Sequence, residues 1–196
     1  MIAVVVFALS GLGLAGVAGC SNGGGVETLD GAPGTRAPEA PSAGISTGPA
    51  SAALPSGTTK VLVLRAYQGY WTAQVKALDS GKVSGSGLQT YTTGAALSAV
   101  NANAFRLTQA GLRMSGQPSR NPSVTALGPV APGSGVQTAT ITDCLDVTAW
   151  HQIDATTGQL RDPAQRLTRY RTVVSARTVG GVWMISAVQN KTGQSC

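Results

Sequence analysis

The spacing of hydrophobic residues changes once along the chain, near Pro118. Before this point, apolar side chains recur every three or four residues, as on one face of a helix, in a stretch that includes Leu64, Tyr67 and Trp71. After it, apolar and polar residues alternate, which is typical of strands that bury one face. A chain with helices first and strands afterwards is expected to fold as an α+β domain.

The pattern divides into two helices and four strands. The first helix is expected to begin after a capping Thr58 or Thr59 and to end near Gly81, and the second covers 95–112. Four segments alternate as strands do, namely 123–127, 137–149, 167–178 and 182–189. The pair Gly180-Gly181 between the last two predicts a tight hairpin turn. We therefore expect two helices packed on one face of a curved, four-stranded antiparallel sheet.

The N-terminal segment has the composition of an export signal. Residues 2–18 carry no charge, and the segment closes with the small-residue run Val17-Ala18-Gly19-Cys20. This run resembles the bacterial lipobox, in which a peptidase cuts before the cysteine and the cysteine sulfur carries a diacylglycerol. The resemblance implies a signal peptide at 1–19 and a lipidated Cys20 that holds the mature protein at the extracytoplasmic face of the cell membrane. No basic residue precedes Arg36, and an uncleaved apolar anchor is the alternative.

A linker is expected to follow the lipobox. Of the 39 residues from 21 to 59, 30 are Gly, Ala, Pro, Ser or Thr, and none is aromatic. Such a segment buries too little apolar surface to fold, so 20–59 is predicted to be a disordered tether with an end-to-end distance of roughly 30–40 Å. The remaining segment, 60–196, holds 13 basic and 5 acidic residues, so the positive charge belongs to the expected folded domain.

Several short motifs, spread over about 70% of the chain, resemble the nuclear transport factor 2-like cone fold. They are Ala66-Tyr67 and Tyr70-Trp71 in the first helix, Asp143-Cys144-Leu145-Asp146 in the long strand, and Tyr170-Arg171-Thr172-Val173-Val174 and Gly181-Val182-Trp183-Met184-Ile185 in the last hairpin. Together with a C-terminal cysteine they resemble a group of secreted, lipid-anchored actinobacterial proteins. Proteins with this cone include isomerases, polyketide cyclases, Mce-associated membrane proteins and domains of transpeptidases. The resemblance therefore implies a fold and no single activity.

Once Cys20 is assigned to the lipid, Cys144 and Cys196 remain as an even pair in an oxidising compartment. We expect them to form a disulfide that holds the C-terminus against the long strand. The alternative is a catalytic thiol at Cys144 served by His151 as the base.

Asp143 is the best candidate for acid–base chemistry. It shares the apolar face of its strand with Ile141 and Leu145, and isomerase-like relatives use an Asp with a Tyr, for which Tyr67 and Tyr170 are the candidates. The alternative is an ordinary ion pair between Asp143 and an arginine of the neighbouring strand.

Three arginines of one strand, Arg169, Arg171 and Arg177, share parity and are candidates for contact with an anion. An anionic lipid or wall polymer fits an exported domain better than a nucleic acid, and a solvated sheet face is the alternative. His151 with Asp146 and Asp154 follows no known metal-ligand pattern, so neither a metal nor a cofactor is expected.

These observations favour a lipid-anchored, non-catalytic module that binds an envelope protein or a small apolar ligand. An isomerase- or cyclase-like enzyme that uses Asp143 is the first alternative. An accessory subunit of a membrane transport or wall-synthesis complex is the second.

Overall fold

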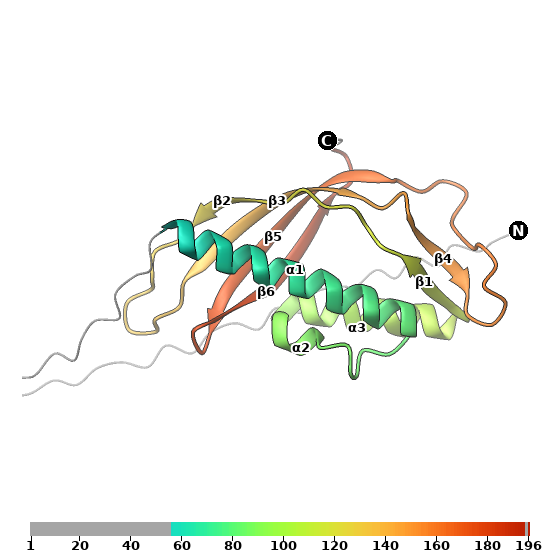
Figure 1. Cartoon of the computed structure of the whole chain (residues 1–196), viewed down its shortest axis with the longest axis horizontal. Coiled ribbons are helices and arrows are strands. Elements are labelled where there is room, and N and C mark those ends of the chain that lie inside the picture. The colour runs from blue at the N-terminus through green and yellow to red at the C-terminus, as the bar shows by residue number, and fades with distance from the viewer. Residues whose placement is uncertain (1–55, 195) are drawn as a thin grey trace, which may run out of the picture. The chain divides into compact units, whose positions relative to one another are not determined.

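The computed structural model describes residues 56–194 and Cys196, all of which belong to one compact unit. The expected signal peptide, the lipobox with Cys20 and the tether up to residue 55 lie outside the described residues. Within the described part, three helices are followed by six strands (Figure 1). No helix among 56–194 is long and apolar enough to cross a membrane.

The helices are α1 (Ser56–Ser80), the single turn α2 (Leu88–Tyr91) and α3 (Gly94–Gln109). The first begins earlier than predicted, so neither Thr58 nor Thr59 is a cap, because both lie inside the helix. Thr59 is only 2% exposed, because it lies on the buried face of the first helical turns. The expected end is confirmed by Gly81, whose φ of +66° is the left-handed conformation that glycine tolerates best.

The main sheet has four strands in the order β2-β3-β5-β6, and every neighbouring pair is antiparallel. The strands are β2 (Ser123–Leu127), β3 (Thr138–Asp146), β5 (Arg169–Val179) and β6 (Val182–Lys191). Gly180 and Gly181 both have positive φ, as a two-residue type I′ turn requires. The predicted α+β order of helices before an antiparallel sheet is therefore confirmed.

A second, two-stranded sheet was not predicted. It pairs β1 (Leu112–Gly116) with β4 (Trp150–Asp154), so that Met114 lies opposite Gln152. The second helix was predicted to extend through Leu112, whereas α3 ends at Gln109, just before Gly111, whose φ is +66°. In β4 the buried residues are Trp150 and Ile153, a spacing of three that hides the alternation expected of a strand.

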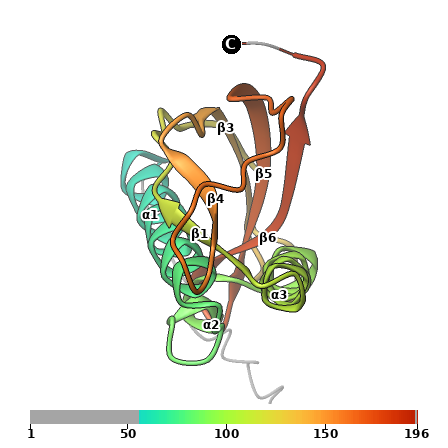
Figure 2. The same ribbon diagram turned by 90° about the vertical axis from the view of Figure 1, so that its right-hand side faces the viewer.

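The core lies between the helices and the inner face of the main sheet. In Figure 2, α1 lies at the left and α3 at the right, and β5 and β6 pass between them in this view; both helices contact β6. The largest fully buried side chains come from both layers and include Tyr67 and Leu78 of α1, Ile141 and Leu145 of β3, and Ile185 of β6. This arrangement buries the apolar stripe of α1 against the alternating apolar residues of the strands.

A candidate ligand cavity between the helices and the sheet

A cavity of about 290 Å³ lies between α1, α3 and the strands. This volume is at the lower end of the ~300–1,000 Å³ usual for small-molecule sites. Its walls are Tyr70, Trp71 and Gln74 of α1, Ala99, Val100, Asn103 and Arg106 of α3, Leu145 of β3, Trp150 of β4, Tyr170 of β5, and Val188 and Asn190 of β6. Because Arg106 and Asn190 are exposed, they mark the side on which the cavity meets solvent.

Aromatic rings form one wall of this cavity. Tyr70 and Trp71 are each 3% exposed, and their ring centroids are 5.3 Å apart. Trp71 also meets Trp150 edge to face, with centroids 5.8 Å apart. Such edge-to-face contacts hold the rings in one arrangement, so the wall is formed before any ligand arrives.

Three buried polar atoms of the lining residues have no hydrogen-bond partner within the described part of the chain. They are Oε1 of Gln74, an acceptor, and Nε1 of Trp71 and Nε1 of Trp150, both donors. Leaving a buried donor or acceptor unpaired costs about 1–3 kcal/mol, so native proteins rarely do so without a reason. A ligand or water in the cavity that both donates and accepts hydrogen bonds could satisfy such atoms.

The two tyrosines of the cavity remain protonated. Burial raises the pKa of Tyr70, and the proximity of Tyr170 raises it further. Burial also raises the pKa of Tyr170, although the positive charge of Arg166 opposes this effect. Both hydroxyl groups can therefore donate a hydrogen bond at neutral pH. Of the three catalytic candidates chosen from the sequence, Asp143, Tyr67 and Tyr170, only Tyr170 lines the cavity.

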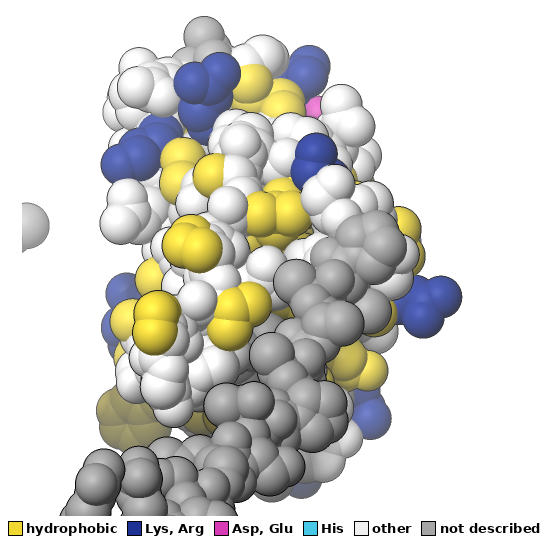
Figure 3. All heavy atoms as spheres, turned by 90° about the vertical axis from the view of Figure 1, so that its left-hand side faces the viewer, with side chains coloured by type: hydrophobic (Ala, Val, Ile, Leu, Met, Phe, Trp, Pro, Cys, Tyr) yellow, Lys and Arg dark blue, Asp and Glu magenta, His cyan; other side chains and the backbone are white. Residues whose placement is uncertain are grey.

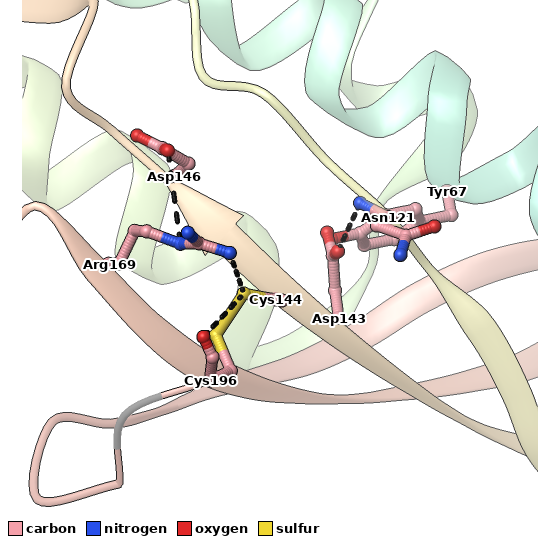
Figure 4. Close-up of a disulfide and its surroundings, with 7 residues drawn as sticks. All are labelled: Tyr67, Asn121, Asp143, Cys144, Asp146, Arg169 and Cys196. Atoms are coloured by element: carbon pink, nitrogen blue, oxygen red, sulfur yellow. Dashed lines mark hydrogen bonds and ion pairs between the residues drawn. A yellow bond between two sulfur atoms is a disulfide. The ribbon is translucent and has the colours of Figure 1, made fainter.

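Asp143 and Tyr67 contact each other in the core, away from this cavity (Figure 4). The Tyr67 hydroxyl donates to Oδ2 of Asp143 over 2.5 Å, and the backbone N–H of Asn121 donates to Oδ1 over 2.6 Å. Asp143 is 1% exposed and Tyr67 is 0% exposed. The predicted position of Asp143 on the buried face is confirmed. The alternative of an ion pair with an arginine of the neighbouring strand is wrong, because the side-chain partner of Asp143 is Tyr67 of α1. The pair ties α1 to β3, and neither member lines the cavity described above.

Cys144 and Cys196 are joined as a disulfide, with sulfur atoms 2.12 Å apart (Figure 4). Cys144 follows Asp143, so its side chain lies on the outer face of β3. The bond holds the end of the chain against that face, as expected. Since the sulfur is bonded, the alternative of a catalytic thiol served by His151 is not supported.

The three arginines chosen from the sequence are exposed on the outer face of β5. Arg169 lies 3.9 Å from Asp146 and also donates to the sulfur of Cys144. Within residues 56–194, Arg171 and Arg177 take part in no ion pair. The shared face is therefore as predicted, and a bound anion stays a prediction.

An ionic cluster between β4 and the segment that follows it was not predicted from the sequence. Nδ1 of His151 lies 2.6 Å from Asp162, which also pairs with Arg166. Burial opposes ionisation of Asp162, yet its contacts with His151, the Gln152 backbone and Arg166 hold its pKa below the usual range. His151 is thus engaged with Asp162 rather than with Asp146 or Asp154, and no group of three metal-ligating side chains occurs among the described residues.

Gln74 and Trp150, which carry two of the three unpaired atoms, were also not singled out from the sequence. A signal for Gln74 is present in the sequence, because it occupies the apolar stripe of α1 at helical spacing from Trp71 and Leu78. A polar residue in such a stripe indicates a buried hydrogen bond or a lined cavity.

Comparison with known proteins identifies the fold alone. No known protein family and no curated protein sequence matches this chain. Among the solved structures with a similar fold is the intermembrane space region of the chloroplast protein ARC6, with a TM-score of 0.50 and 14% sequence identity, over 71% of this chain and 98% of that one. At this identity the likeness extends to the arrangement of helices and strands and to nothing beyond it.

Proposed function

We propose that this protein is a non-catalytic, lipid-anchored module on the extracytoplasmic face of a bacterial membrane, and that its cavity holds a small, largely apolar ligand. The observation that carries the proposal is the set of three unpaired polar atoms, Trp71 Nε1, Gln74 Oε1 and Trp150 Nε1, on residues that line a preformed aromatic cavity. A concave apolar site with a few polar groups is the usual form of a small-molecule site.

The polar atoms restrict the chemistry of the ligand. Gln74 Oε1 requires a donor, and Trp71 Nε1 and Trp150 Nε1 each require an acceptor; a hydroxyl or an amide supplies both kinds of group. Apart from Asn103, Arg106 and Asn190, the rest of the wall is aromatic or aliphatic, so most of the remaining ligand is expected to be apolar. Arg106 at the solvent side would favour an anionic or strongly polar end.

The anchor and the fold family belong to the same proposal. The tetrad ending at Cys20 supports lipidation, and the Cys144–Cys196 disulfide fits an oxidising compartment. Helices that cover the inner face of an antiparallel sheet, with a cavity between them, support a nuclear transport factor 2-like cone. Burial of Asp143 against Tyr67 favours a binding role over an isomerase-like one, because a catalytic carboxylate must reach its substrate.

The experiment compares two substitutions on α3. Ala99 is exposed and lines the cavity, whereas Ala102 is exposed on the same helix and does not. Ala99→Trp places an indole at the cavity, and Ala102→Trp is the matched control for surface and folding effects. Each protein is purified from its host membrane under native conditions and extracted with organic solvent, and the extract is analysed by mass spectrometry.

We expect one small molecule to accompany the native protein and the Ala102→Trp variant in near-stoichiometric amount, and to be at least tenfold depleted from Ala99→Trp. Equal amounts in both variants would place the ligand elsewhere. The absence of any such molecule from the native protein would refute the proposed role of the cavity.

A further inference from the structure

The end of the domain at which α1 begins exposes an unusual number of apolar side chains. Val61 is 52% exposed, Val130 45%, Val179 42% and Val182 57%. They come from the first turns of α1, the β2–β3 connection and the β5–β6 turn, which Figure 1 shows at the same end of the domain. We call this surface, formed by Val61, Val130, Val179 and Val182, the valine end.

A groove deepens this surface between α1 and the β5–β6 turn. Its volume is about 600 Å³, and its lining includes Leu62 and Arg65 of α1, Tyr91 of α2, and Val182 and Trp183 of β6. The groove is distinct from the cavity described above, and the two share no lining residue. Apolar side chains therefore stand out from the valine end and also line a recess within it.

Among the described residues, the charged side chains exposed at the valine end are all positive. Lys60, Arg65 and Arg177 are exposed there, and the segments 56–78, 80–142 and 163–196 contain no Asp or Glu. Four carboxylates elsewhere are engaged with arginines, as Asp79–Arg113, Asp146–Arg169, Asp154–Arg161 and Asp162–Arg166. Figure 3 faces this end and shows hydrophobic side chains across it with Lys and Arg at its margins.

A partner that binds the valine end must contact its apolar side chains and carry negative charge. A second copy of the chain carries the same excess of positive charge, so self-association through this end brings like charges together. The segment 21–55 has no aromatic residue and only a few large aliphatic ones, which suits it poorly to fill a groove of this size. An anionic lipid surface offers both headgroup charge for the cations and an acyl boundary for the valines.

The position of the valine end in the chain agrees with this occupant. α1 starts at Ser56, so the segment leading back to Cys20 joins the domain at this end. We propose that the valine end lies directly on an anionic bilayer, with the valines in the interface and Lys60, Arg65 and Arg177 at the lipid phosphates. The orientation rests on the proposed membrane location, and it adds a second contact to the lipid at Cys20.

The test uses a protein that lacks the proposed lipid at Cys20 but retains the valine end. The chain from residue 20 is prepared with Cys20→Ser, and its binding to vesicles of phosphatidylcholine is compared with binding to vesicles that also contain phosphatidylglycerol. Binding is measured by sedimentation at low and at physiological salt. We expect binding to require phosphatidylglycerol and to weaken as salt is raised, because surface charges are screened.

Matched substitutions then locate the contact. Arg65→Glu and Val182→Asp alter the valine end. Lys82→Glu and Leu160→Asp make equivalent changes at exposed positions outside it, and Leu160 is 62% exposed. Lys82 follows the far end of α1, whose 25 residues span roughly 37 Å at about 1.5 Å per residue.

We expect each change at the valine end to lower the vesicle affinity about fivefold or more, and each control to change it less than twofold. Binding that needs no phosphatidylglycerol, equal losses in test and control variants, or no binding at all would overturn the proposed orientation. Dimers that Val182→Asp abolishes would assign the surface to a second copy instead. The ligand content of the cavity is measured in a separate experiment. A negative result with vesicles would therefore refute the orientation on the membrane without refuting the proposed ligand binding.

Discussion

The contact between Tyr67 and Asp143 allows a quantitative prediction about the stability of the domain. Tyr67→Phe removes the hydroxyl that donates to Asp143 over 2.5 Å and leaves the ring, which packs against Tyr70 and Trp71 at centroid distances of 6.4 and 6.3 Å. The buried carboxylate then retains the backbone N–H of Asn121 as its hydrogen-bond donor. The substitution therefore isolates the hydrogen bond from the packing.

The size of the effect follows from burial. A hydrogen bond to a charged group contributes about 1.5–3 kcal/mol, and the lost donor leaves an oxygen of Asp143 unsolvated at 1% exposure. We expect Tyr67→Phe to lower the free energy of unfolding by about 2 kcal/mol, which corresponds to a fall in Tm of roughly 6–8 °C for a domain of this size.

The assay is urea denaturation followed by tryptophan fluorescence. Tyr91→Phe is the control, since its hydroxyl belongs to a half-buried ring of α2 and makes no hydrogen bond within the described part. A double-mutant cycle with Asp143→Asn measures the coupling between Tyr67 and Asp143. A loss below about 0.5 kcal/mol, or the same loss in the Asp143→Asn background, would refute the idea that this pair ties α1 to β3.

Three further predictions concern stability. Replacing Cys144 and Cys196 together by Ala opens a link across 52 residues and is expected to lower the free energy of unfolding by up to about 4 kcal/mol, measured by urea titration; an unchanged midpoint would contradict this. Burial raises the pKa of Tyr67 and Tyr70. Their contribution to the free energy of unfolding is therefore fully present below about pH 10 and is lost at higher pH. Their phenolate absorbance should accordingly appear only as the protein unfolds. The lowered pKa of Asp162 gives stability that is present above about pH 4 and lost in more acidic solution, and Asp162→Asn should flatten this part of the pH profile of Tm.

The elements that follow a regular hydrophobic period were predicted well, whereas those fixed by tertiary contacts were not. The stripe through Tyr67 and Trp71 predicted α1, and the Gly180-Gly181 pair predicted the β5–β6 hairpin. The β1–β4 pair has no such signal, because its strands are short and its two partners lie far apart in the sequence. Single-strand periodicity cannot reveal such a pairing.

The features of the candidate site also differ in whether sequence periodicity could predict them. Alternation in β3 placed Asp143 inside and Cys144 outside, and both positions are confirmed. The partner of Asp143 was not predictable, since Tyr67 lies 76 residues away on a helix whose rotation about its axis is set by packing. The cavity was missed for a similar reason. Its unpaired atoms belong to Trp71 and Gln74 on α1 and to Trp150 on β4, and only the folded chain brings these residues to one cavity.

Native mass spectrometry of the protein released from its own membrane tests the central claim most directly. The proposal predicts a polypeptide that begins at Cys20, carries the mass of a diacylglycerol, and holds one small molecule that departs on denaturation. A chain that starts at another residue and carries no lipid would contradict the anchor. A lipidated chain with no dissociable molecule, in the folded state, would contradict the proposed role of the cavity.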